Sequence, residues 1–369
     1  MPEGQFDKPE DPLCLPPAGM DLGSGIRYLR LMISVYDIDA LEGWARDHGV
    51  SEHRLKRFRI ALFKKACSLE VCLEEIPADR QDAFAAAVAF PSLRLAGRQD
   101  SNSDGASKLS FRTQDGHLIE TVILRVASGR TSVCISSQVG CAANCAFCAT
   151  GKLGLTRNLT GPEILDQVLL AMRMLREENR SLRNVVFMGM GEPLHNETHL
   201  YQALDALRDP RGFYFADRHL MVSTVGMVDA MGRFVERYPD IRLALSLHSA
   251  RQGVRKSLMP AGKSQTLLRL RDRLPDAGTS RPIMIEYLLL KGVNDGPEDL
   301  TALIEYLQGH QVHINLITFN PYPGAVFTPV SRTERERFGA ALRTAGFTVT
   351  LRRSLGEDIS AACGQLAGT

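Results

Sequence analysis

The chain lacks the features that would place it in a membrane or in a secretory pathway. Its 369 residues contain no run of eighteen apolar residues, so no membrane-spanning helix is expected. The first fifteen residues are mostly polar and are interrupted by prolines, and no basic stretch is followed by an apolar one, which argues against a signal peptide. Eight cysteines in a chain without such a signal lead us to expect a reducing cytoplasm.

The chain also has little net charge. Its 44 basic and 42 acidic side chains give a formal charge of +2, which does not by itself indicate a nucleic-acid binder. The segment 53–65 departs from this balance, because it carries six Lys and Arg residues while Leu55, Phe58 and Leu62 fall on one helical face. This pattern predicts a helix that packs on one side. Its cations fit either contact with phosphates or an ordinary solvated surface.

Three cysteines stand close together with no fourth cysteine near them. Cys141, Cys145 and Cys148 are separated by three and then two residues, and the next cysteine is Cys363. A structural zinc site is normally closed by four ligands, and a four-iron cluster is normally held by four thiolates. Three thiolates leave one iron of a [4Fe–4S] cluster open for chemistry. We favour this interpretation over a zinc site or three buried small side chains.

From about residue 131, short apolar segments alternate with amphipathic ones. Strands are expected at 132–136, 184–188, 219–223, 242–247, 283–289 and 313–318, with 347–352 closing the series. Thr160 and Ser331 each precede a glutamate by three residues, which is the capping signature of a helix start. Strand–helix alternation indicates parallel strands, so we predict an α/β fold with a partial (β/α)6, TIM-like barrel. Polar residues that follow the strands would meet at one edge of it.

The sequence before the barrel suggests three further regions. Residues 1–30 are expected to be a disordered leader, and residues 31–97 a small helical accessory domain that is a candidate for RNA contact, with helices at 39–48, 53–65 and 79–90. Residues 98–127 are expected to form a linker, over 98–106, and a β-hairpin that turns at Asp115 and Gly116. Residues 128–369 would then hold the barrel and a C-terminal loop with Cys363.

The cysteine triplet after the first barrel strand resembles the radical S-adenosylmethionine (SAM) superfamily. Together, segments 134–160, 185–194, 246–248, 314–324 and 357–368 resemble the RlmN/Cfr family, whose members methylate an adenine of bacterial 23S ribosomal RNA. The resemblance covers about residues 100–369. It implies methylation of adenine 2503, at C2 as in RlmN or at C8 as in Cfr, and some relatives also methylate adenine 37 of transfer RNA. Segments 191–193 and 320–324 look like the C2 enzymes, whereas 147–151 and 359–363 look closer to the C8 enzymes. We expect C2.

The same resemblance implies a mechanism for the remaining cysteines. A cluster on the triplet would bind SAM, with two SAM molecules used per turnover. Cys363 would carry the methyl group, Cys134 would release the product by forming a disulfide with Cys363, and Glu120 would remove the ring proton. The cofactor contacts implied by the matching motifs are Gly191, Glu192, Ser223, Ser246, Leu247, His248 and Asn320. We also expect Ser136, Ser137 and Arg157 to position phosphates or RNA.

The implied partners are 23S ribosomal RNA, transfer RNA and an electron donor such as flavodoxin, and the enzyme is expected to act as a monomer. Two alternatives stay open. A radical SAM enzyme of another kind, such as an activase or a small-molecule enzyme, predicts that Cys363 is dispensable. A non-enzymatic iron–sulfur or zinc RNA-binding module predicts no cleavage of SAM on reduction.

Overall fold

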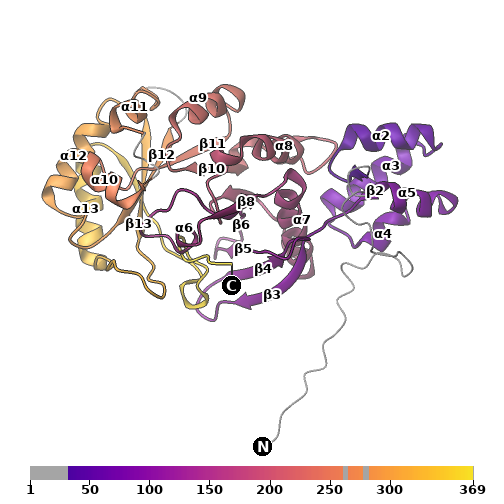
Figure 1. Ribbon diagram of the computed structural model, residues 1–369, viewed down its shortest axis with the longest axis horizontal. Helices are drawn as coiled ribbons and strands as arrows, with labels where there is room; N and C mark the ends of the chain where they lie inside the picture. The colour runs from indigo at the N-terminus through magenta and orange to yellow at the C-terminus, as the bar shows by residue number, and fades with distance from the viewer. Residues whose placement is uncertain (1–31, 261–264, 277–281, 369) are drawn as a thin grey trace, which may run out of the picture.

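The computed structural model describes residues 32–260, 265–276 and 282–368. The expected leader, residues 1–30, lies outside them. Figure 1 shows a barrel-like body of strands and covering helices, with a separate group of helices at one end of the molecule. No helix in the described ranges is long and apolar enough to cross a membrane.

Seven parallel strands of the described chain form the partial barrel, in the order β14-β13-β12-β11-β10-β9-β6. Their bounds are β6 (Thr131–Cys134), β9 (Asn184–Phe187), β10 (Leu220–Thr224), β11 (Arg242–Ser246), β12 (Ile283–Leu289), β13 (Val312–Thr318) and β14 (Thr348–Leu351). The barrel is not closed, because β14 ends the sheet while β6 continues into further strands. The predicted partial barrel is confirmed, and each predicted strand is present within one or two residues at its ends.

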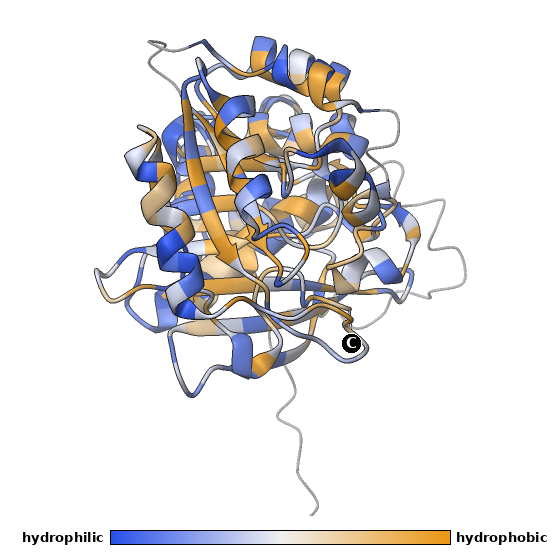
Figure 2. Cartoon of the chain, turned by 90° about the vertical axis from the view of Figure 1, so that its left-hand side faces the viewer, coloured by the Kyte–Doolittle hydropathy of each residue, from blue (hydrophilic) through white to orange (hydrophobic). Residues whose placement is uncertain are grey.

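Amphipathic helices cover the outside of the strands. They are α7 (Gly161–Glu177), α8 (Glu197–Arg208), α9 (Val228–Arg237), α10 (Gln252–Leu258), α11 (Leu267–Arg271), α12 (Pro297–Leu307) and α13 (Arg332–Thr344). The hydropathy colouring of Figure 2 shows mostly apolar strands inside and hydrophilic residues on the outer faces of the helices. Thr160 and Ser331 form the predicted capping boxes with Glu163 and Glu334.

Three antiparallel strands extend the barrel sheet beyond β6. They are β5 (Leu118–Arg125), β4 (Ala106–Arg112) and β3 (Arg94–Asp100), and the turn at 115–116 joins β4 to β5 as predicted. The expectation that residues 98–106 are only a linker is wrong, since β3 runs through Asp100. Most β3 side chains are exposed, so the segment lacks apolar alternation, and pairing with β4 decides its conformation.

The helical unit consists of α2 (Ile38–Asp47), α3 (Glu52–Arg59), a π-helical turn η1 (Ile60–Lys64), α4 (Leu69–Leu73), a short 3-10 turn η2 (Ala78–Arg80) and α5 (Gln81–Ala87). Two short parallel strands, β1 (Ile33–Ser34) and β2 (Val88–Ala89), bring its two ends together. The third predicted helix is therefore shorter than expected, because its last residues pair as β2.

The helical unit is attached to the barrel through buried polar contacts. The Tyr36 hydroxyl donates to Asp166 of α7 over 2.7 Å, and the ammonium of Lys64 donates to the carbonyl of Phe213 over 2.8 Å. The apolar core also runs continuously from the helical unit into the barrel. Contacts of this kind fix the unit against the side of the barrel that carries α7.

Candidate active site

The cysteine triplet lies in a loop pinned by a small two-stranded sheet. After β6 the chain forms β7 (Gln138–Gly140), which pairs with β8 (Leu155–Asn158), and the triplet and α6 (Ala149–Lys152) lie between them. Gly140 adopts φ 75°, and a side chain there would overlap the carbonyl oxygen of Gly154. All three cysteines line one cavity of about 150 Å³ at the carboxyl ends of the barrel strands, which we call the cluster cavity.

The three buried thiols need a ligand that carries positive metal charge if they are to ionise. Burial raises the pKa of Cys141 to about 12, and burial together with the neighbouring thiols also raises the pKa of Cys145. Burial likewise raises the pKa of Cys148. Such thiols become thiolates only when metal charge compensates them. The donor set therefore fits an iron–sulfur cluster with three protein ligands.

No three acidic, histidine or cysteine side chains in the described ranges converge as a site for a single ion. One cation near the triplet was missed from the sequence. Arg255 is buried, donates to the carbonyl of Val225 over 2.6 Å and interacts electrostatically with Cys145.

The Gly-Met-Gly-Glu turn after β9 packs directly on the segment that leads to the triplet. Gly191 has φ 105°, and a Cβ atom there would come within 2.7 Å of Gln138 Cβ. The Glu192 carboxylate lines the cluster cavity and accepts from the amides of Val225, over 2.7 Å, and Leu194, over 3.1 Å. Burial nevertheless raises the pKa of Glu192 to about 7. Its charge is therefore marginal at neutral pH.

Ser223, Ser246 and His248 line the cluster cavity from the ends of β10 and β11. His248 Nδ1 accepts from the Leu288 amide over 3.0 Å, so in the neutral ring Nε2 carries the proton and is a donor. Burial lowers the pKa of His248 to about 3, which keeps the ring neutral. Leu247 is buried and does not line the cavity. Its amide donates to the Glu286 carbonyl over 3.1 Å.

Cys363 stands in the wall between two cavities. One is the cluster cavity, and the other, of about 260 Å³, is lined by Cys134 among others; we call it the Cys134 cavity. Cys363, Cys148, Met188 and Arg352 line both. The two cavities thus bring Cys363 next to the triplet on one side and next to Cys134 on the other. All of these thiols are free.

The loop of Cys363 is held in place on several sides. Asn320 donates from its side-chain amide to the Cys363 carbonyl over 3.2 Å, and Gln365 donates to the carbonyl of Pro321 over 2.7 Å. The hydroxyl of Thr150, two residues after the triplet, donates to the carbonyl of Leu366 over 2.6 Å. Asn320 does not line the cluster cavity, so in this structure its partner is the Cys363 loop.

Glu120 lies on β5, away from the lining of both cavities. Its carboxylate is buried. One oxygen accepts from the amides of Ala367, over 2.8 Å, and Gly368, over 3.1 Å, and the other lies 3.3 Å from the Lys108 ammonium. Ala367 and Gly368 therefore cover the group that the resemblance assigns to proton removal.

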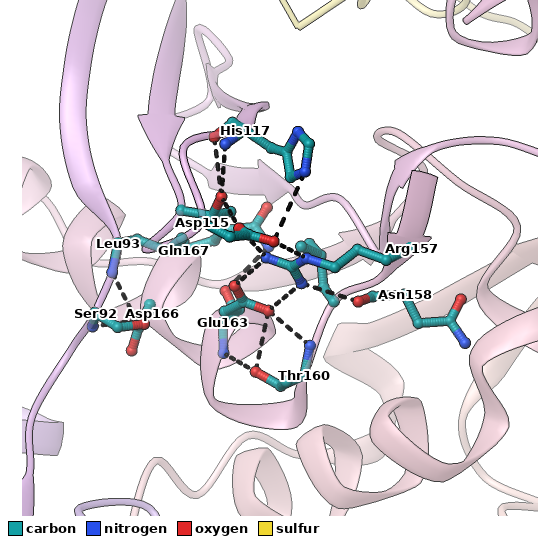
Figure 3. A network of polar contacts seen from close by, with 12 residues as sticks. Ser92, Leu93, Asp115, His117, Arg157, Asn158, Thr160, Glu163, Asp166 and Gln167 are labelled. Atoms are coloured by element: carbon teal, nitrogen blue, oxygen red, sulfur yellow. Dashed lines mark hydrogen bonds and ion pairs between the residues drawn. The ribbon is translucent and has the colours of Figure 1, made fainter. Parts of the chain in front are cut away.

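The expectation that Ser136 and Ser137 contact phosphates or RNA is wrong, because both are buried and point into the protein. The Ser136 hydroxyl donates to the Glu120 carbonyl over 2.6 Å. Figure 3 shows Arg157 between two carboxylates, Asp115 at 2.7 Å and Glu163 at 2.8 Å. Arg157 therefore ties the β4–β5 turn to the start of α7, which explains its position without RNA.

Comparisons with known proteins agree with this architecture. The model of the radical SAM superfamily matches residues 135–307. A probable RNA methyltransferase of Rhodopirellula baltica is 44% identical over 90% of this chain and 87% of its own length. A dual-specificity RNA methyltransferase RlmN of Syntrophobacter fumaroxidans is 41% identical over 73% of this chain and 78% of its own length.

The crystal structure of a radical SAM methyltransferase from Sphaerobacter thermophilus is 36% identical in sequence and superposes with a TM-score of 0.84, over 91% of this chain and all of that one. The similarity includes the partial barrel and extends well beyond the superfamily core. The predicted fold and the predicted enzyme class are confirmed. This chain belongs to the RlmN family of radical SAM RNA methyltransferases.

Proposed function

We propose that the enzyme methylates an RNA adenine at C2 through a methyl group carried on Cys363. The observation that carries the proposal is the position of Cys363 in the wall between the cluster cavity and the Cys134 cavity. A methyl group on its sulfur can face the triplet while Cys134 remains within the same group of side chains. The names of the relatives support RNA as the substrate.

Residues of the cluster cavity have the donors and acceptors that SAM requires. When bound, an iron–sulfur cluster on Cys141, Cys145 and Cys148 together with SAM supplies a carbon radical able to remove a hydrogen atom from a methyl group. Glu192 offers an acceptor to the methionine amine, and His248 Nε2 offers a donor to an oxygen atom. Ser223 and Ser246 offer hydroxyls at the neighbouring strand ends.

Cys363 takes its methyl group from one SAM molecule, and a second is used when hydrogen is removed from that methyl group. The methylene carbon then bonds to the adenine, and the ring proton leaves to a base while one electron leaves to the electron carrier. The Cys134 thiolate attacks the Cys363 sulfur, so that an S–S bond forms as the C–S bond breaks, and the released carbon takes a proton to become the methyl group of the base. Two electrons from the donor then reduce the disulfide. Burial raises the pKa of Cys134 to about 12, while the nearby guanidinium of Arg352 opposes this rise and favours the thiolate that the attack requires. Glu120 is our candidate for the ring proton acceptor, which requires Ala367 and Gly368 to move from its carboxylate.

The finer assignments are proposals as well. The substrate is adenine 2503 of 23S ribosomal RNA, with adenine 37 of transfer RNA as a second substrate, and the electrons come from a flavodoxin-like donor in a reducing cytoplasm. The protein acts as a monomer. Residues 31–97 are an accessory domain for RNA contact, the β-hairpin within 98–127 extends the sheet, and 128–369 are the catalytic part.

Peptide mass spectrometry of anaerobically purified protein tests the mechanism. We expect a methyl group on Cys363. Cys363→Ala should abolish RNA methylation while SAM cleavage on reduction continues, and Cys134→Ala should leave RNA attached to Cys363. Cys72→Ala is the matched control, because Cys72 is a buried thiol of the helical unit. An active preparation without methyl on Cys363, or activity in Cys363→Ala, would refute the proposal.

Segments 147–151 and 359–363, which look like those of the C8 enzymes, keep C8 as the second candidate. Nucleosides from ribosomal RNA of a null strain, with and without this gene, decide between the two carbons. We expect 2-methyladenosine. Finding 8-methyladenosine alone would assign the enzyme to the C8 type.

A further inference from the structure

A second recessed surface lies at the end of the barrel opposite the two cysteine cavities. A groove of about 760 Å³ runs between η1 of the helical unit and the connections that lead into β9 and β10. Through Arg183 and His219 it joins a cavity of about 420 Å³ at the amino ends of the barrel strands. Exposed cations line the two hollows, and we call six of them the basic face: Lys65, Arg176, Arg180, Arg183, Arg218 and Arg242.

The cations of the basic face have no carboxylate partners within the described ranges. Among the described residues that line the two hollows, the one carboxylate is Glu286, which is buried and accepts from Asn315 over 2.8 Å. Asp217, beside Arg218 in the sequence, is paired with Arg208 at 2.7 Å. The positive charge of this surface is therefore left for an external anion.

The side chain of His219 lies where the two hollows meet, and its pKa responds to the positive charges around it. Its Nδ1 lies 2.9 Å from Asn184 Oδ1. Burial lowers the pKa of His219, and Arg218, Arg183 and Arg242 lower it further. Three guanidinium groups thus act on one imidazole ring.

An exposed aromatic ring stands in the same groove. Tyr214, in the connection between α8 and β10, is 66% exposed and adopts φ 60°. The ammonium of Lys64 lies 5.0 Å from the centre of its ring and donates to the carbonyl of the preceding residue, Phe213. The loop is thereby fixed with the ring directed to solvent. Unpaired bases stack on such rings in a sequence-tolerant way, while neighbouring cations hold the phosphates.

We propose that the basic face is a second RNA-binding surface, which holds the backbone of the substrate RNA and stacks one unpaired base on Tyr214. It rests on the proposed function in taking RNA as the substrate, and it lies away from the adenine that is methylated. A double helix would use the cations but has no use for the ring, since its bases are already stacked. The pairing of ring and cations therefore indicates a single strand or a loop.

Binding of two RNAs to the full chain tests the proposal. One is a short stem–loop with only the target adenine, and the other is a longer fragment of 23S ribosomal RNA around it, both measured by fluorescence anisotropy over a series of salt concentrations. The variants are the double change Arg183→Glu with Arg218→Glu, Tyr214→Ala and Tyr214→Phe. The matched control is Arg337→Glu on α13, an exposed arginine at the other end of the molecule in Figure 1.

For the longer RNA, we expect the double variant to weaken binding by about tenfold or more and to reduce the slope of log K against log salt by about 1–2. Tyr214→Ala should weaken binding about tenfold, and Tyr214→Phe should restore it. All variants should bind the short stem–loop with the same affinity as the wild type. SAM cleavage on reduction should not change in any variant, because Tyr214, Arg183 and Arg218 do not line the cluster cavity.

Normal binding of the longer RNA by the double variant, or an equal loss with Arg337→Glu, would overturn the proposal. If Tyr214→Ala and Tyr214→Phe weakened binding of the longer RNA equally, a base would not stack on the Tyr214 ring. If the variants lost as much affinity for heparin as for the longer RNA, the basic face would be a general polyanion site instead. Absence of methyl-Cys363 in the wild type would count against the proposed function alone, because RNA binding is measured without turnover.

Discussion

The side-chain amide of Asn320 donates a hydrogen bond of 3.2 Å to the main-chain carbonyl of Cys363. Asn320 follows β13, so the bond joins the end of a rigid barrel strand to the loop that carries the methyl-accepting thiol we propose. The motif had assigned Asn320 to the cofactor. The hydrogen bond to the Cys363 carbonyl leads us to propose a second role, in which Asn320 positions Cys363, and the two roles predict different kinetics.

Asn320→Ala should lower kcat for RNA methylation by about fivefold while the Kd for SAM stays within about twofold, since a lost neutral hydrogen bond corresponds to roughly 1 kcal/mol. Equilibrium binding of SAM to anaerobic, cluster-loaded protein and single-turnover methylation measure the two quantities. Gln365→Ala, which removes a neighbouring anchor of the same loop, should give the same pattern. A weaker Kd for SAM with unchanged kcat would return Asn320 to the cofactor site.

The sequence predicts the barrel well because its signals are local. Apolar runs mark the strands, and capping boxes such as that of Thr160 mark the helix starts. The family resemblance implied the site residues Glu192 and His248, and both line the cluster cavity at the carboxyl ends of neighbouring parallel strands, where such strands meet. The edge strand β3 was missed because its exposed side chains carry no alternation and its partner strand decides its conformation.

Two site cations were also missed, and for a related reason. Arg255 and Arg352 are two of 44 basic residues, and no feature of their neighbours in the sequence marks them. The fold buries Arg255 near Cys145. It also places Arg352, which follows β14, in the lining of the cavity that holds Cys134 and Cys363 and in electrostatic interaction with both thiols. Long-range packing assigns both positions, so no local pattern could have found them.

The ionisation of Glu192 should control SAM binding near neutral pH. Burial raises its pKa to about 7, and the carboxylate is the stronger acceptor for an amine. Below pH 7 the protonated form prevails, so we expect SAM affinity to fall as the pH is lowered from 8 to 6. Titrations at each pH with wild type and Glu192→Gln check this, and the Gln variant should bind weakly with a flatter profile. Parallel pH profiles for both proteins would contradict the role.

The ionisation of Glu192 should also change the free energy of unfolding with pH when SAM is absent. The folded protein holds the Glu192 proton more tightly than the unfolded chain, whose pKa is near 4.5, so ionisation of Glu192 costs stability as pH rises from about 4.5 to 7. The size of this component is ~3 kcal/mol. Urea unfolding of wild type at pH 5 and pH 8 should show it, and the component should be absent from Glu192→Gln. An equal pH dependence in the two proteins would exclude it.

Arg352 should assist the step in which Cys134 attacks Cys363. Its guanidinium lines both cavities and lowers the pKa of Cys134 against the effect of burial. Arg352→Gln should therefore slow alkylation of Cys134 by iodoacetamide about tenfold, the change in thiolate population that one pKa unit represents. Arg352→Lys should recover part of the rate because it keeps the charge. During turnover the Gln variant should accumulate RNA attached to Cys363, visible on a denaturing gel, and normal alkylation by that variant would disprove the effect.

Tyr214 should show a conflict between stability and RNA binding. Its backbone has φ 60°, a conformation that costs a residue with a side chain roughly 1–2 kcal/mol and costs glycine little. Tyr214→Gly should therefore be more stable than Tyr214→Ala by about 1 kcal/mol, the reverse of the usual order of these two residues. Both variants lose the ring beside Lys64, so the difference between them isolates the backbone. Chemical denaturation measures the stabilities, and both variants should bind the longer RNA equally poorly. A less stable Gly variant would show that the loop does not keep this backbone conformation in solution.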